Sequence, residues 1–397
     1  MRRLIAALSV SLLTASTLAL VSEPAAAANP SQLGPRVIYV DTSARNVRFT
    51  IDGADAYTYP YSSFAVKGNS SANWPKKPYG VTFKDNQQPF GLPLGRSFRL
   101  LANYHDRSLL RNWISYDLAR KMSGLTWTPH SVFTEMFING KYQGSYQMIE
   151  TVAISSNRIA IPRSTGQIGE FDAGGSLTDR TGMRTSLKDP TDSTRGDDLM
   201  TKVNKFTWHL DHDEQWPQFI DMASFVDYYL VREFTKDKDA DFLFSNFYYT
   251  PDVFDSTTNS KLFMGPVWDF DRSAGNEAGI TSTTVASPKY WWLRGSGAHH
   301  PWDQRHWYVK LTAKASFRAA LCERFTATAG NFQYAGNGAI ADAYKAAGGS
   351  VPVTNDRKLW GSSNVERPPS RGAYGDEIAY LSDWYKKRYY WMRDNIC

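Results

Sequence analysis

Two neighbouring residues, Asn139 and Gly140, constrain the fold of the first part of the chain most strongly. They separate two runs rich in β-branched and aromatic residues, 132–138 and 142–149, and both tolerate the positive φ that a two-residue hairpin turn requires. Further short β-rich runs come before them, at 36–40, 47–51, 64–66 and 74–83. The sequence up to Glu150 therefore predicts a strand-rich unit.

Helices are expected in the part of the chain that follows. Apolar residues recur every three or four positions at 108–122. Another helix is expected at 222–235, and two amphipathic helices are expected at the C-terminal end, the last of them at 376–395. A second hairpin is expected from 246–249 and 261–264, whereas 155–205 is rich in Gly, Ser, Thr and Asp and predicts an irregular insertion. About 370 residues follow the predicted leader, which is more than a single compact core usually accommodates. We therefore expect two lobes, 29–150 and 151–397.

The first 28 residues have the pattern of a secretory signal peptide. Arg2 and Arg3 precede an apolar stretch, and Ala26 and Ala28 stand at the small-residue positions of a cleavage site. We therefore expect a secreted protein, extracellular or at the cell surface, that begins near Asn29 after cleavage. An uncleaved membrane anchor is the alternative. No later segment is apolar enough to span a bilayer.

Charge and cysteine content narrow the function further. The leader contains two positive residues and one negative residue, so its removal lowers the net charge from +6 to +5. The chain has no dense stripe of Lys and Arg. We therefore do not expect nucleic acid as a partner. Cys322 and Cys397 are the two cysteines of the chain. In an oxidising compartment they predict one disulfide, because a structural zinc site needs four ligands.

Two acidic clusters carry the predicted chemistry. Asp241 precedes Asn246 by five positions, the interval between the base and the metal-binding Asn of the protein-kinase catalytic loop, although Asp239 competes for the role of base. Asp269 and Asp271 share a face if the segment is extended, which permits a two-carboxylate clamp on Mg²⁺ or Mn²⁺. A solvated acidic turn is the alternative for the first cluster.

A cation for the phosphates of ATP is expected at Lys77. In a strand, Lys77 would project with Tyr79 on one face and Lys76 on the other. A solvated surface lysine is the alternative. The turn formed by Gly68, Ser70 and Ser71 is a candidate for backbone N–H contacts to phosphate.

The remaining candidates for nucleotide binding are a carboxylate and aromatic rings. Glu150 lies where the chain crosses between the lobes, so we expect it near the adenine, with Tyr142 or Tyr146 as a stacking partner and Trp268 as a further ring. The helix at 108–122 contains no Glu to pair with Lys77, only Asp117. His105 and Asp106, which precede that helix, are candidate participants.

Four ordered motifs resemble the CotH kinase-like family, the spore coat protein H relatives, in a secreted actinobacterial-type form. They are KGNSS with PKKPY at 67–71 and 75–79, LANYHD with LLRN at 101–106 and 109–112, FINGKYQGSY at 137–146, and PVWDFD at 266–271. The resemblance implies an α+β, atypical protein-kinase-like two-lobed fold, with a small β-rich N-lobe and a larger, mostly helical C-lobe. It also implies transfer of the γ-phosphate of ATP to Ser or Thr of an extracellular or cell-surface protein, with Mg²⁺ or Mn²⁺.

Two other functions remain open from the sequence. One is a non-catalytic surface or adhesion protein on the same scaffold, which would bind through the aromatic-rich segments 290–292 and 302–307. The other is carbohydrate hydrolysis by paired carboxylates such as Asp241 and Asp269, which would have to face each other across a cleft.

Overall fold

The computed structural model of the chain describes residues 29–241, 244–255, 259–277, 286–294, 306–365 and 367–397, without the side chains of Ser193 and Asp241. The predicted leader, residues 1–28, lies outside the described residues, and its processing stays a prediction. Among the described helices, none combines the length and the apolar character needed to cross a membrane.

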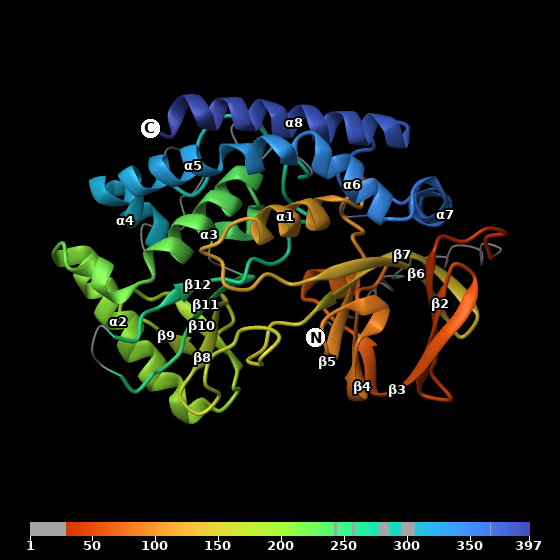
Figure 1. Ribbon diagram of the computed structural model, residues 1–397, viewed down its shortest axis with the longest axis horizontal. Helices are drawn as coiled ribbons and strands as arrows, with labels where there is room; N and C mark the ends of the chain where they lie inside the picture. The colour runs from red at the N-terminus through yellow and green to blue at the C-terminus, as the bar shows by residue number, and fades with distance from the viewer. Residues whose placement is uncertain (1–28, 242–243, 256–258, 278–285, 295–305, 366) are drawn as a thin grey trace, which may run out of the picture.

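Seven strands close into a barrel near the N-terminus (Figure 1). Their order is β1-β2-β3-β4-β5-β7-β6, and neighbours are antiparallel except for β1, which is parallel to β6. The strands are β1 Arg36–Asp41, β2 Asn46–Ile51, β3 Ala54–Val66, β4 Tyr79–Gln87, β5 Gly95–Leu101, β6 Ser131–Ile138 and β7 Lys141–Glu150. Alternate apolar side chains such as Phe49, Phe83 and Phe98 fill the interior and are fully buried.

The predicted Asn139-Gly140 hairpin is confirmed. Both residues have positive φ, 47° and 79°, and they join β6 directly to β7. Barrel closure was not predicted, because the β1–β6 pairing joins strands almost 100 residues apart, for example Val37 with Glu135. Local sequence patterns carry no information on such a pairing.

A second sheet has the strand order β12-β11-β8-β10-β9. Its strands are β8 Gln167–Phe171, β9 Leu177–Thr178, β10 Arg184–Asp189, β11 Asn246–Thr250 and β12 Phe263–Met264. The predicted pairing of 246–249 with 261–264 is confirmed by Tyr248 opposite Met264. The irregular insertion expected at 155–205 is wrong, because it contains three of these strands. Their small and polar residues hide the alternation: Gly169 leaves space for the ring of Tyr248, and Glu170 and Lys188 line a cleft.

The described residues contain eight α-helices and five short 3₁₀ helices. The α-helices are α1 Arg111–Arg120, α2 Gly196–His212, α3 Met222–Thr235, α4 Trp307–Ala313, α5 Ala315–Ala335, α6 Gly338–Ala346, α7 Ser350–Trp360 and α8 Tyr374–Asn395. The 3₁₀ helices are η1 Ser70–Asn73, η2 Pro89–Gly91, η3 Ser193–Arg195, η4 Trp216–Phe219 and η5 Lys238–Asp241. The helices expected at 108–122, 222–235 and 376–395 are confirmed as α1, α3 and α8, but five helices rather than two form the C-terminal part.

Helix α3 lies at the centre of the helical part, and α5 and α8 lie above it in Figure 1. It begins at Asp221, whose carboxylate accepts a hydrogen bond from the N–H of Ser224 at 2.8 Å. All its residues from Ser224 to Thr235 are buried. A disulfide between Cys322 in α5 and Cys397 attaches the C-terminus to this layer, as predicted. The expected mixed α and β fold with a β-rich N-terminal region is confirmed.

Candidate active site

A cleft of about 780 Å³ lies between the barrel and the second sheet. The barrel side contributes the loop that contains Gly68, Ser70 and Ser71, together with Arg99 and Asn103. Glu170, Lys188 and Phe247 line it from the second sheet, and Asp239, Trp268, Asp269 and Asp271 from the segments next to that sheet. Seven of the residues that the sequence selected therefore face one cavity.

Three acids of the cleft, Asp239, Asp269 and Asp271, have raised pKa values, first because they are buried. Burial and the charge of Asp239 raise the pKa of Asp269 to about 6. Burial and then the charges of Asp269 and Asp239 raise the pKa of Asp271 well above its ordinary range, and burial raises the pKa of Asp239. Burial is the largest cause in each case, so the charged carboxylates are poorly solvated, and a bound cation would stabilise their charged form.

The basic residues nearest these acids are already engaged by other acids. Arg232 forms a fully buried ion pair with Asp237. Arg272 donates through Nε to the carboxylate of Glu277 at 2.9 Å, and Lys238 donates to the same carboxylate at 2.5 Å. These cations lower the pKa of the cleft acids only in part, and burial remains the largest effect on each of the acids.

The backbone around Phe270 aims two of the acids at the cleft. Asp269 has a left-handed conformation, with φ of 65°, so the segment is not the extended strand that the sequence suggested. Both carboxylates nevertheless line the cleft, whereas the ring of Phe270 between them is fully buried. The hydroxyl of Tyr116 accepts a hydrogen bond from the N–H of Asp269 at 3.2 Å.

A chain of side-chain amides connects the barrel to this segment. The side-chain amide of Asn103 donates to the side-chain oxygen of Gln147 in β7 at 3.1 Å, and the amide of Asn112 donates to the side-chain oxygen of Asn103 at 2.9 Å. The side-chain oxygen of Asn112 accepts from the N–H of Phe270 at 2.8 Å. Sequence reasoning gave neither Asn a role, although both lie in the ordered family motifs.

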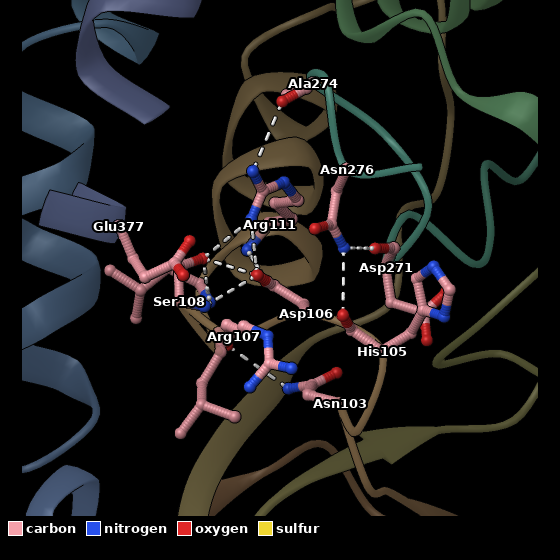
Figure 2. Close-up of polar contacts among 12 residues, drawn as sticks. Asn103, His105, Asp106, Arg107, Ser108, Arg111, Asp271, Ala274, Asn276 and Glu377 are labelled. Carbon is pink, nitrogen blue, oxygen red and sulfur yellow. Dashed lines mark hydrogen bonds and ion pairs between the residues drawn. The ribbon is translucent and has the colours of Figure 1, made fainter. Parts of the chain in front are cut away.

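His105 and Asp106 support the same segment from below (Figure 2). Asp106 forms a buried ion pair with Arg111 at 2.5 Å, and Arg111 donates to the backbone oxygens of Ser273 and Ala274 at 3.0 and 3.3 Å. The amide of Asn276 donates to the backbone oxygens of His105 and Asp271 at 3.2 and 2.6 Å. Asp106 is therefore a buried support of the loop, and it does not line the cleft.

The glycine of the barrel loop is required by its geometry. Gly68 has φ of 111°, and a Cβ atom at this position would lie 2.1 Å from the side-chain oxygen of Ser71. The loop turns back sharply here and presents Gly68, Ser70 and Ser71 to the cleft.

The expected position of Lys77 is corrected by the structure. Strand β4 begins only at Tyr79, so the alternation of side chains does not extend to the lysines. Lys77 donates to the backbone oxygen of Ala72 at 2.8 Å and does not line the cleft. Lys76 is the buried lysine, and it pairs with Asp356 of α7 at 2.5 Å.

Glu150 and the two tyrosines also lie away from the cleft. Glu150 is fully buried and accepts from the N–H and the ring of His130, both at 2.9 Å; the residues after it, Thr151 and Val152, line the cleft instead. Tyr142 donates to the carboxylate of Glu135 on the far side of the barrel, and Tyr146 is fully buried. None of the three is placed to contact a base.

Asn246 lies behind the segment that contains Asp239 and supports it. It is fully buried, its side-chain oxygen accepts from the hydroxyl of Tyr228 at 2.8 Å, and its amide donates to the backbone oxygen of Asp239 at 2.6 Å. It does not line the cleft, which corrects its prediction as a metal ligand. The side chain of Asp241 lies outside the described residues, although its backbone ends η5.

The described residues contain no preformed group of three or more His, Cys, Asp or Glu side chains that would hold a metal ion. Mg²⁺ is usually held by one or two carboxylates together with substrate phosphates and water. Burial and then neighbouring carboxylates raise the pKa values of Asp269 and Asp271, which fits that arrangement, in which the phosphates would complete the coordination.

Comparison with known proteins identifies a family for the chain. The family described as CotH kinase protein matches residues 64–392. A crystal structure of the Golgi casein kinase with Mn/ADP bound is similar at 8% sequence identity and a TM-score of 0.33, over 85% of this chain and 74% of that chain. Another crystal structure of the Golgi casein kinase gives 9% identity and a TM-score of 0.32 over the same shares. No curated protein matches. Because the family match spans most of the described residues, the chain belongs to the CotH kinase protein family.

Proposed function

We propose that this chain is a secreted, atypical protein kinase that transfers the γ-phosphoryl group of ATP to a Ser or Thr hydroxyl of an extracellular or cell-surface protein. One observation carries the proposal: Asp239, Asp269 and Asp271 converge in a single cleft that the loop at Gly68 also lines. Phosphoryl transfer requires mainly positioning and neutralisation of charge, and these residue types supply both.

The roles of the acids follow from their positions. Asp269 and Asp271 flank a buried ring and are the candidates for holding Mg²⁺ or Mn²⁺. A bound divalent cation would offset the charge of the phosphates. Asp239 lines the same cleft and is a candidate to accept the hydrogen bond of the acceptor hydroxyl, with Asp241 as its competitor.

The nucleotide is proposed to lie between two lobes, 29–150 and 151–397. Backbone N–H groups at Gly68, Ser70 and Ser71 would face the phosphates. The apolar part of the cleft, which includes Val152, Phe247 and Trp268, would receive the base. Secretion is proposed from the leader pattern, and the disulfide between Cys322 and Cys397 fits an oxidising compartment.

The adhesion surface expected at 290–292 and 302–307 is only partly buried. Trp292 and Trp307 are 8% and 0% exposed and belong to the core, whereas Tyr290 is 57% exposed. Trp302 lies outside the described residues. The non-catalytic adhesion function is therefore kept as the second candidate, behind the kinase.

The proposal is tested with purified protein, γ-labelled ATP, Mn²⁺ or Mg²⁺ and a Ser-rich acceptor. We expect label transfer by the wild type, and its loss in Asp269→Asn and Asp239→Asn. Asp383→Asn is the matched control, because Asp383 is an exposed acid of α8 paired with Lys387. Absence of transfer by folded wild-type protein with either metal would refute the proposal, as would full activity of Asp269→Asn.

A further inference from the structure

The half-buried guanidinium of Arg99 lines the cleft and has no partner among the residues that the structure describes. Arg99 projects from β5, and the described residues give it neither a hydrogen bond nor an ion pair. Burial lowers the pKa of this guanidinium, which shows that water only partly solvates it. An unpaired, partly desolvated guanidinium is a strong binding site for an anion.

The barrel is shaped to admit this side chain. Gly80 lies opposite Arg99 in the β4–β5 pairing. A Cβ atom at Gly80 would lie 2.8 Å from Nη1 of Arg99 and 2.9 Å from Cγ of Lys67. Because Gly80 does not have a positive φ, the reason for glycine is space and not backbone conformation. The missing side chain therefore lets two cationic residues lie against the strand.

A second cation faces Arg99 from the opposite wall. Lys188 of β10 lines the cleft, and its pKa is lowered by burial and by the charge of Arg99. An anion bound between Arg99 and Lys188 would offset the repulsion of these two like charges. Arg99 and Lys188 come from different sheets, so an anion bound by both would join the two walls.

Lys188 is also connected to the acids. It pairs with Glu170, and the other oxygen of that carboxylate accepts from the N–H of Ser245 at 3.0 Å. The hydroxyl of Ser245 lies 3.5 Å from the carboxylate of Asp269. Helix α1 contains no Glu that could pair with a phosphate-binding lysine. Glu170 of the second sheet supplies the carboxylate that pairs with Lys188 instead.

We propose that Arg99 and Lys188 bind the phosphate chain of the nucleoside triphosphate from both walls of the cleft, with Glu170 positioning Lys188. This assignment rests on the proposed function and replaces Lys77 as the phosphate-binding cation. The same chemistry would also suit an acidic or phosphorylated acceptor peptide. The position of the pair favours the nucleotide, because Glu170 and Ser245 connect Lys188 to Asp269, the proposed metal ligand.

The test compares the affinities of Mn·ATP and of adenosine, which lacks phosphates, in Arg99→Gln, Lys188→Gln and the wild type. We expect each substitution to weaken Mn·ATP binding at least about tenfold and to leave adenosine binding unchanged. Arg99→Lys should recover part of the loss. Lys84→Gln is the control, since Lys84 is an exposed barrel cation outside the cleft lining. Melting temperatures establish that each variant is folded.

Gly80→Ala provides a variant that changes no charge. It should weaken Mn·ATP binding, because the added methyl group displaces Arg99. Unchanged Mn·ATP affinity in both Gln variants, with a raised KM for the acceptor, would overturn the assignment in favour of an acceptor site. Unchanged Mn·ATP affinity together with an unchanged KM for the acceptor would overturn the assignment for either ligand. A folded wild type that binds no Mn·ATP would instead refute the proposed function itself.

Discussion

The side-chain oxygen of Asn112 accepts a hydrogen bond from the backbone N–H of Phe270, at 2.8 Å. Phe270 separates the acids Asp269 and Asp271, so this bond fixes the backbone from which both carboxylates enter the cleft. Through Asn103, the same amide chain reaches Gln147 in the barrel. The geometry of the acids is thus connected to the opposite wall.

Asn112→Ala is expected to impair activity more than its effect on stability accounts for. It leaves a buried N–H unsatisfied, which costs about 1–3 kcal/mol, and it frees the backbone that aims Asp269. We expect kcat to fall at least about tenfold, since small displacements of catalytic groups have effects of this size. Steady-state kinetics on the folded variant measures this. Asn331→Ala, an exposed amide of α5, is the control, and equal kcat values in the two variants would contradict the role of Asn112.

The Lys76–Asp356 pair is expected to be essential for stability. Both groups are buried, and the carboxylate also accepts from the N–H of Ser145 at 2.9 Å. Asp356→Ala would leave the ammonium group buried without a counter-charge, so urea unfolding should show a loss of about 3–5 kcal/mol. Asp383→Ala, which breaks the exposed pair with Lys387, should change stability by less than about 1 kcal/mol. A similar loss in both variants would show that burial of the pair has no special effect.

Asp269→Asn is expected to stabilise the metal-free protein at neutral pH. The pKa of Asp269 rises from its ordinary value of 3.8 to about 6 on folding, because burial and Asp239 disfavour its charge. Protonated Asp269 adds to the free energy of unfolding. This contribution is complete below pH 3.8 and is lost as the pH rises through about 6. At pH 7.5 the charge therefore costs roughly 1–3 kcal/mol, which the substitution removes.

Urea unfolding at pH 4 and pH 7.5 measures this difference. Wild type and variant should differ little at the lower pH, where the carboxyl group is mostly protonated, and the variant should be more stable at the higher pH. A variant that is less stable at pH 7.5 would contradict the proposed crowding of negative charge in the cleft.

Binding of Mn²⁺ is expected to weaken as the pH falls. Asp269 has a pKa of about 6, and that of Asp271 is raised well above its ordinary range, so protons compete with the metal even near neutrality. Below pH 6 the affinity should fall by about tenfold per pH unit for each proton displaced. Titration of Mn²⁺ in the presence of ATP, at pH 5.5, 6.5 and 7.5, checks this. Equal affinity at all three values would exclude these carboxylates as the ligands.

Short-range signals in the sequence predicted part of the fold. The turn at Asn139 and Gly140 was predictable because two residues decide its geometry. Helix α3 was predicted with its full bounds, and it spans Met222–Thr235 as expected. The closure of the barrel and strands β8 to β10 were not predictable from the sequence. Their pairings are long-range, and the residues that face the cleft interrupt the alternation of apolar and polar residues along the strands.

For a similar reason, only some residues of the candidate site could be predicted from the sequence. Asp239, Asp269 and Asp271 stand in compact motifs that are recognisable without a fold, and all three line the cleft. Arg99 and Lys188 meet only because two sheets face each other, so no local pattern marks them. Lys77 was selected by extending strand alternation past Pro78 into an irregular loop, where the rule does not apply.

Calorimetric titration of ATP into the protein in the presence of Mn²⁺ tests the central claim most directly. The convergence of Asp269 and Asp271 with the barrel loop predicts one metal-dependent nucleotide site in the wild type, and its loss in Asp269→Asn despite an intact fold. Absence of binding by folded wild-type protein, or equal binding by the variant, would contradict it.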